Sequence, residues 1–237
     1  MIRDWRSGLG AGLVFLAASA AFADNAPVPL HADAANSPAA AAIARSAVPA
    51  KVATVDAAAA IKKANAYFNA TTTMIANFDQ IGPDGTHTTG KVYVQKPGRL
   101  RFEYDAPATL EIIADGTSVA VRDRKLATQD TYFIWQTPLK FLLNAHIDLA
   151  HDTRVLDVGT DGPTTSIAVE DSATLGGTSR IRLVFDSATF TLKQWSVVDA
   201  QNYQTTVSLS NIDNNSKPDA SLFKIPAVVH DDSNPYH

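Results

Sequence analysis

Residues 78–107, FDQIGPDGTHTTGKVYVQKPGRLRFEYDAP, alternate apolar and polar side chains over three successive segments. The dipeptides Asp84-Gly85 and Pro97-Gly98 separate these segments, and both are favoured in turns. Because successive side chains of a strand point to opposite faces, the pattern predicts three antiparallel strands that share one apolar face. A sheet of this kind has to bury that face against something, and what covers it bears directly on function.

The apolar face of these strands can be assigned from the alternation. One side of the second strand is expected to carry Val92, Val94 and Lys96. The third strand adds Leu100, Phe102 and Tyr104 to that face, whereas Arg99, Arg101 and Glu103 point the other way.

Further alternating segments extend the sheet. With the first three strands they bring the expected number to about eleven, and they cover residues 110–114, 118–122, 126–131, 154–158, 164–169, 180–185, 190–198 and 203–209. In the tenth of these strands Trp195 is expected on the same face as Lys193 and Val197, as a core residue rather than a ligand platform.

Two helices are expected beside the strands. Asp56 is a suitable N-cap for an amphipathic helix in which Ile61, Ala64 and Phe68 form one apolar stripe. A second, short helix is expected with Thr137 as its cap and Pro138 in its first turn. Its apolar face would carry Leu139, Leu142 and Leu143, and the pattern leaves open whether it plugs the core or forms a lid over a cavity.

This combination predicts a mainly β fold, an incomplete, strongly curved antiparallel β-barrel covered by short α-helices. Such a shell encloses either a dry core or a ligand cavity. Periodicity does not choose between the two.

The N-terminus has the pattern of an export signal. Arg3 and Arg6 precede an apolar run, and Ala21-Phe22-Ala23 forms an A-x-A cleavage pattern. Residues 1–23 are therefore expected to be a signal peptide cleaved after Ala23, which places the mature protein in a periplasm. Residues 24–54, rich in alanine and proline, are expected to be a disordered tail, residues 55–226 the folded domain, and residues 227–237 a mobile C-terminal tail.

Composition excludes several kinds of site. The net charge of -4 gives no reason to expect nucleic acid as a partner. The chain has no cysteine, which excludes disulfides, thiolate metal ligands, a cysteine nucleophile and a lipid-modified N-terminal cysteine. His146, Asp148, His151 and Asp152 could imitate a metal cluster, but their spacing favours solvated loop residues. No nucleotide-binding or hydrolase motif occurs, so we expect a non-enzyme without catalytic residues, metal or cofactor.

A series of motifs from about Asp56 to Pro226 resembles the outer-membrane lipoprotein carrier protein (LolA) family. The first is the strand ending Phe78-Asp79-Gln80, followed by the glycine, basic and aromatic residues of 90–104. Pro107 and the Ala114-Asp115-Gly116 turn come next, and the helix at Thr137 stands where a lid helix would lie. The series closes with residues 219–226, DASLFKIP.

The resemblance implies a function. Members of the family are soluble periplasmic carriers that take acylated lipoproteins from an inner-membrane transporter and pass them to an outer-membrane receptor. This chain is expected to be a monomer. The receptor is itself a lipoprotein, so the missing cysteine favours the carrier. The acyl-chain cavity would then be lined by Val92, Val94, Leu100, Phe102, Tyr104, Leu110 and Ile112.

Lys96 is the position where this chain departs from the family. The resemblance implies an arginine here that holds the lid closed over the empty cavity. A lysine can donate to lid carbonyls, but it lacks the planar fork of arginine and is more strongly hydrated. We expect Lys96, with Leu139, Leu142 and Leu143 of the lid, to form a weaker latch; alternatively, Lys96 extends into water at the strand end.

Two other functions remain open from the sequence. A cavity of this kind sets how much chain is buried and not which headgroup is carried, so another lipid or a hydrophobic small molecule is one alternative. A periplasmic sensor domain that binds a partner through the same face is the other.

Overall fold

The computed structural model describes residues 56–174 and 176–227. The expected signal peptide with its cleavage site at Ala23, the Ala/Pro-rich tail and residues 228–237 lie outside the described residues.

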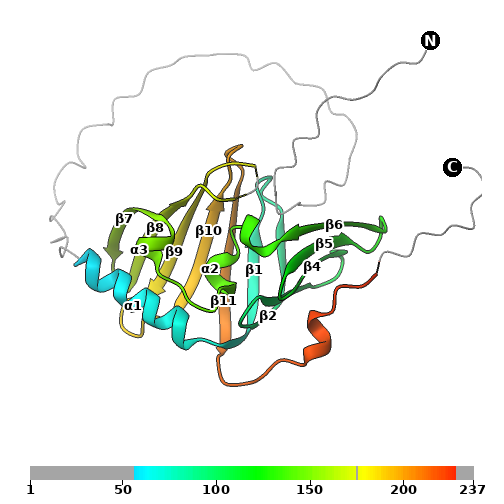
Figure 1. Cartoon of the computed structure of the whole chain (residues 1–237), viewed down its shortest axis with the longest axis horizontal. Helices are drawn as coiled ribbons and strands as arrows, with labels where there is room; N and C mark the ends of the chain where they lie inside the picture. The colour runs from blue at the N-terminus through cyan, green and yellow to red at the C-terminus, as the bar shows by residue number, and fades with distance from the viewer. Residues whose placement is uncertain (1–55, 175, 228–237) are drawn as a thin grey trace, which may run out of the picture. The chain divides into compact units, whose positions relative to one another are not determined.

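The described chain forms one antiparallel sheet of eleven strands, in the order β6-β5-β4-β3-β2-β1-β11-β10-β9-β8-β7 (Figure 1). Since β6 and β7 end the order without pairing to each other, the sheet is not closed. The expected mainly β, open antiparallel architecture is confirmed. The strands are β1 (Thr73–Ile81), β2 (His87–Gln95), β3 (Arg99–Tyr104), β4 (Leu110–Asp115), β5 (Ser118–Asp123), β6 (Thr128–Phe133), β7 (Arg154–Asp161), β8 (Thr164–Asp171), β9 (Ser179–Asp186), β10 (Leu192–Val198) and β11 (Gln204–Asp213).

The three strands expected from residues 78–107 form the middle of this sheet. Val92 pairs with Ala76 of β1 and with Phe102 of β3, so the apolar residues of neighbouring strands lie side by side. Leu100 and Phe102 are fully buried, whereas Arg99 and Glu103 are exposed. The period-two pattern therefore predicted both the strands and their inner face.

The prediction that Lys193 shares a face with Trp195 is wrong. The pairing of β10 with β9 shifts between Leu192 and Gln194, which marks a bulge. A bulge inserts one residue and moves the following side chains to the opposite face. Leu192 and Trp195 are consequently buried together, while Lys193 is exposed.

Helix α1 (Ala57–Ala70) begins as expected. The Asp56 carboxylate accepts a hydrogen bond from the Ala59 N–H, and Ala60, Ala64 and Phe68 are the buried residues of the helix. These three lie at spacings of four, so the helix turns one apolar stripe toward the sheet.

The second expected helix starts later than the sequence indicated. A 3-10 turn, η1 (Ile134–Gln136), precedes it, and α2 (Lys140–Leu143) has Leu139 as its N-cap. Thr137 does not cap α2, because its hydroxyl donates backwards to the Ile134 carbonyl at 2.8 Å. A further turn of helix, α3 (Leu149–Asp152), is capped by Asp148.

The helices lie on one face of the sheet, and the core is between them and that face (Figure 1). We call α1 together with residues 140–152 the cover. Phe68 of α1 and Phe141 of α2 meet edge to face at 6.0 Å between ring centroids, and Phe141 meets Trp195 of β10 at 5.9 Å. Such aromatic contacts add to the stabilisation from burial alone.

The opposite face of β3 and β4 carries the C-terminal segment. A 3-10 turn, η2 (Ala220–Phe223), is capped by Asp219 and places Phe223 in a buried position. Arg101 holds this segment, because it donates to the Leu222 carbonyl at 3.4 Å and pairs with Glu111 at 2.6 Å.

In the described part of the chain, the search for a helix with the length and apolarity needed to cross a membrane found none.

Candidate functional site

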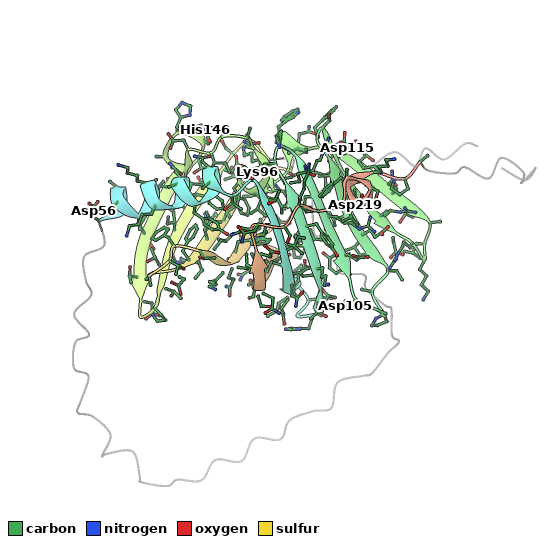
Figure 2. The ribbon with its side chains drawn as sticks, turned by 90° about the horizontal axis from the view of Figure 1, so that it is seen from below. Asp56, Lys96, Asp105, Asp115, His146 and Asp219 are labelled. Carbon is green, nitrogen blue, oxygen red and sulfur yellow. The ribbon has the colours of Figure 1, made fainter. Side chains whose placement is uncertain are left out.

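The turn between β2 and β3 holds both main parts of the cover. The Lys96 ammonium donates to the Phe68 carbonyl near the end of α1, at 2.6 Å. Two residues later, the Gly98 N–H donates to the Leu143 carbonyl at the end of α2, at 2.8 Å. Figure 2 shows Lys96 beside the end of α1, on the same rim of the sheet as Asp115 and His146 and on the opposite rim from Asp105.

Gly98 is required for this arrangement. Its φ is +75°, in the left-handed region that side chains disfavour, and a Cβ there would lie 2.7 Å from the Gly116 Cα. Only glycine fits both the angle and the close approach to the neighbouring turn. The turn can therefore present the Gly98 N–H to α2 only because Gly98 lacks a side chain.

Lys96 was expected at the end of the second strand and in contact with a lid carbonyl. In the structure β2 ends at Gln95, Lys96 lies in the turn, and the carbonyl that it reaches belongs to α1, not to the helix after Thr137. The Lys96 ammonium also lies 5.8 Å from the centroid of the Phe68 ring. The side chain is partly buried, and this burial lowers the pKa of Lys96 from 10.5 to about 8.

This lowered pKa gives a pH dependence with a defined sign. Between about pH 8 and about pH 10 the unfolded chain binds the Lys96 proton more strongly than the folded chain does, so the free energy of unfolding should rise with pH. We expect the wild type to gain stability over that range relative to the Lys96→Leu protein, by less than about 1.4 kcal/mol per pH unit. Urea unfolding of both proteins at a series of pH values measures the difference. If the free energies of unfolding of the two proteins changed in parallel with pH, the Lys96 ammonium would remain hydrated in the folded state.

A buried ion pair holds α2 to the end of β8. The Lys140 ammonium lies 2.7 Å from one carboxylate oxygen of Asp171 and 2.8 Å from the other. Asp171 ends β8 and is only 2% exposed, and its carboxylate also accepts from the Ala173 N–H. The sequence analysis singled out neither residue, since their contact joins segments that no local pattern connects.

A cavity of about 200 Å³ is lined by residues of the segment 140–153 and of strands β8 and β9. Ile147 and Leu149 line it from the cover, and Val169 and Ile181 line it from β8 and β9. Pockets for drug-sized ligands typically measure about 300–1,000 Å³, so this cavity is small for a long acyl chain while the cover is in place. Half of its lining residues are apolar, and Lys140, Asp152 and Asp171 are its charged members.

The residues expected to line an acyl-chain cavity lie elsewhere in the same core. Leu110 is partly buried and packs against the cluster between sheet and cover. The other six are buried members of that cluster: Val92, Val94, Leu100, Phe102, Tyr104 and Ile112. Tyr104 donates to the Gln80 side chain at 3.0 Å inside this cluster. Leu139, Leu142 and Leu143, expected on the lid, also pack into it.

The residues that could imitate a metal cluster have other roles. Asp148 caps α3 through the Ala150 N–H, and His151 contacts the neighbouring Asp152 at 3.3 Å on the surface. Within residues 56–174 and 176–227 no group of three histidine or acidic side chains is placed to hold a metal ion.

Comparisons with known proteins identify the family. A family model described as outer membrane lipoprotein carrier protein LolA matches residues 69–226. The outer-membrane lipoprotein carrier protein of Legionella pneumophila strain Corby is 29% identical over 164 residues, which cover 66% of this chain and 80% of that protein. The corresponding protein of strain Paris gives the same identity and coverage.

Solved structures were also compared. The LolA superfamily protein NE2245 from Nitrosomonas europaea is 12% identical, with 72% of this chain and 98% of that chain covered and a TM-score of 0.41. Lipoprotein LppX from Mycobacterium tuberculosis is 10% identical, with 69% and 99% covered and a TM-score of 0.39. TM-scores this low do not support a shared function. The family model, in contrast, spans well over half of the 237 residues, and the chain therefore belongs to the outer-membrane lipoprotein carrier (LolA) family.

Proposed function

We propose that this protein is a periplasmic carrier that binds the acyl chains of lipoproteins between the sheet and the cover. It would receive them from an inner-membrane lipoprotein-releasing transporter and deliver them, as a monomer, to an outer-membrane lipoprotein receptor. Membership of the carrier family supports this role. The observation that carries it is a continuous apolar sheet face whose cover is attached by a small number of polar contacts.

The cover is suited to exchange with a ligand. Phe68, Phe141 and Leu149 bury apolar surface against the sheet, and an acyl chain would bury the same sheet surface if these side chains moved away. Each methylene that leaves water contributes about 0.8 kcal/mol and each of these side chains about 1.5–3 kcal/mol, so roughly six to eleven methylenes offset the burial that the three side chains lose. Binding of this kind is reversible, as a carrier requires.

Transfer then needs no bound nucleotide. A receptor that holds the same chains more tightly draws them from the carrier, with a tenfold preference for each roughly 1.4 kcal/mol. The proposed role consists of burial and release of apolar surface, and it requires no catalytic step.

Lys96 would act as the latch of this carrier. Its contact with the Phe68 carbonyl is short, yet its ammonium is partly desolvated, as the lowered pKa indicates. A charge that is costly to bury makes a weaker latch than a guanidinium, which is less strongly hydrated and can contact two carbonyls at once. We infer that the cover of this protein opens more readily than that of a relative with arginine at this position.

Release of lipoproteins from spheroplasts tests the proposal. The mature protein is incubated with spheroplasts, and the soluble fraction is searched for acylated lipoproteins bound to it. We expect lipoproteins to be released in amounts that depend on the protein added. The Lys96→Leu protein should load and release them at altered rates, with Lys62→Leu on the exposed side of α1 as a matched control.

Two results would count against parts of this proposal. If the protein recovered from spheroplasts held phospholipid or another lipid and no lipoprotein, the lipoprotein-carrier role would be wrong and a carrier of other lipids would replace it. If Lys96→Leu left both loading and release unchanged, Lys96 would not be a latch.

A further inference from the structure

Two asparagines of α1 bind the segment that leads from α2 into α3. Asn69 uses both ends of its amide on one residue: its Nδ2 donates to the Ile147 carbonyl at 2.9 Å, and its Oδ1 accepts from the Ile147 N–H at 2.8 Å. Asn65 accepts from the Leu149 N–H at 3.0 Å and donates to the Asp148 carboxylate at 3.1 Å. We call these four hydrogen bonds the asparagine ladder.

The ladder depends on a match between two spacings. Asn65 and Asn69 are four residues apart, so they lie on one face of α1, one turn from each other. Asp148, the residue between Ile147 and the first residue of α3, has an extended backbone, so the N–H groups of Ile147 and Leu149 can both point toward α1. The asparagine amides thus satisfy the backbone groups of Ile147 and Leu149, as a neighbouring strand would in a sheet.

The segment needs these partners. Ile147 is 2% and Leu149 is 1% exposed, and both side chains lie in the core. Buried backbone N–H groups without an acceptor are costly, and the acceptors of these two are the asparagines. Residues 144–146, which join the segment to α2, are in contrast all exposed.

The cover therefore has two parts. The first consists of α1 and residues 147–152, joined by the asparagine ladder. The second is α2, which Gly98 and the Lys140–Asp171 pair hold to the sheet and which meets the first part at the Phe68–Phe141 ring contact. Both parts line the cavity, the first through Ile147, Leu149 and Asp152 and the second through Lys140 and Phe141.

We propose that Asn65 and Asn69 are positioning residues that make α1 and residues 147–152 open as a single plate, so that release of Lys96 uncovers the cavity. Lys96 holds the carbonyl of Phe68, and the next residue, Asn69, holds Ile147 at the cavity. A contact at the turn is thereby connected to the cavity through two adjacent residues of α1. The proposal rests on the proposed function, because it describes how that carrier would open.

Hydrogen exchange of the ligand-free protein, followed by NMR, tests the coupling. In the wild-type background, Lys96→Leu should speed exchange of the α1 amides and of the Ile147 and Leu149 amides by the same factor, about tenfold.

In the Asn65→Ala/Asn69→Ala protein the Ile147 and Leu149 N–H groups lose their acceptors. The His151 and Asp152 amides, which donate to the Asp148 carbonyl, therefore report on the segment in both backgrounds. Lys96→Leu should speed exchange of these two amides together with the α1 amides in the wild-type background, and should speed only the α1 amides in the double alanine protein. Amides in the middle of the sheet, such as those of Phe78 in β1 and Val207 in β11, should not respond in either background.

Graded and matched variants keep the result interpretable. Asn69→Asp retains an acceptor for the Ile147 N–H but loses the donor to its carbonyl, and should give partial coupling. Asn65→Asp would set a second carboxylate against that of Asp148, so Asn69→Asp is the variant that serves if the double alanine protein does not fold. Lys62→Ala, on the exposed side of α1, should leave the coupling as it is in the wild type.

The outcomes separate the plate from the carrier function. If Lys96→Leu speeds α1 exchange while the Ile147 and Leu149 amides keep their wild-type rates, the plate is wrong even when spheroplasts release lipoproteins. If exchange at both places rises together but also rises equally throughout the sheet, the asparagines only support global stability and the proposal is overturned. Coupled exchange without lipoprotein release would support the plate and contradict the carrier.

Discussion

Replacement of Lys140 by methionine is expected to lower the free energy of unfolding by about 3–5 kcal/mol, among the largest effects of any single change in this protein. The substitution leaves the Asp171 carboxylate, which is 2% exposed, without its cation. An isolated buried charge is far more costly than a buried pair. Chemical denaturation with urea measures the change, and α2 should lose protection from hydrogen exchange before the sheet does.

A second substitution shows whether the loss comes from the charge. Lys140→Met/Asp171→Asn removes both charges and keeps a side chain that can accept from the Ala173 N–H, so most of the stability should return. Lys193→Met, at an exposed lysine of β10, is the matched control and should change stability little. A Lys140→Met protein as stable as the wild type would mean that water reaches Asp171 and that the pair does not hold α2.

Gly90→Ala is expected to destabilise the fold by about 2–4 kcal/mol, because the centre of the sheet has no room for a methyl group. A Cβ on Gly90 would lie 2.0 Å from the Glu103 carbonyl oxygen of β3 and 2.8 Å from the Phe78 ring of β1. Neither the strand pairing nor the ring can yield without opening the inner face. Thermal and urea unfolding measure the loss.

Gly85→Ala is the comparison that isolates this cause. Gly85 has a φ of +79°, but nothing lies within 4 Å of its Cβ position. Its replacement should cost about 1–2 kcal/mol, from backbone conformation alone. If Gly90→Ala cost no more than Gly85→Ala, β2 and β3 would be free to move apart, and the packing of the inner face would be looser than the structure indicates.

The sheet could be predicted from the sequence because its signal is local. Alternation in residues 78–107 fixes which side chains share a face, and Leu100 and Phe102 lie where that pattern places them. The pattern failed at Lys193, where a bulge adds a residue without any mark in the alternation. It also failed at Thr137, whose hydroxyl bonds back to Ile134 in place of capping the next helix.

The site could be predicted only in part. Lys96 was identified through a resemblance, but its partner Phe68 is 28 residues away and becomes a neighbour only when α1 folds back over the sheet. Asn69 and Ile147 are separated by 78 residues, and their contact depends on two segments meeting with matched spacing. Asn65 and Asn69, four residues apart on a helix, could have indicated a contact with another segment. The same spacing also occurs on a polar helix face that is exposed to water.

The β2–β3 turn concentrates the control of the cover in a few backbone positions. Lys96 and Gly98 hold α1 and α2 from one short segment, so a shift of that turn by the length of a hydrogen bond would break both contacts at once. A shift of either helix alone would break only one of them. For a partner protein, this turn would therefore be one place at which the contacts to both helices can be broken together.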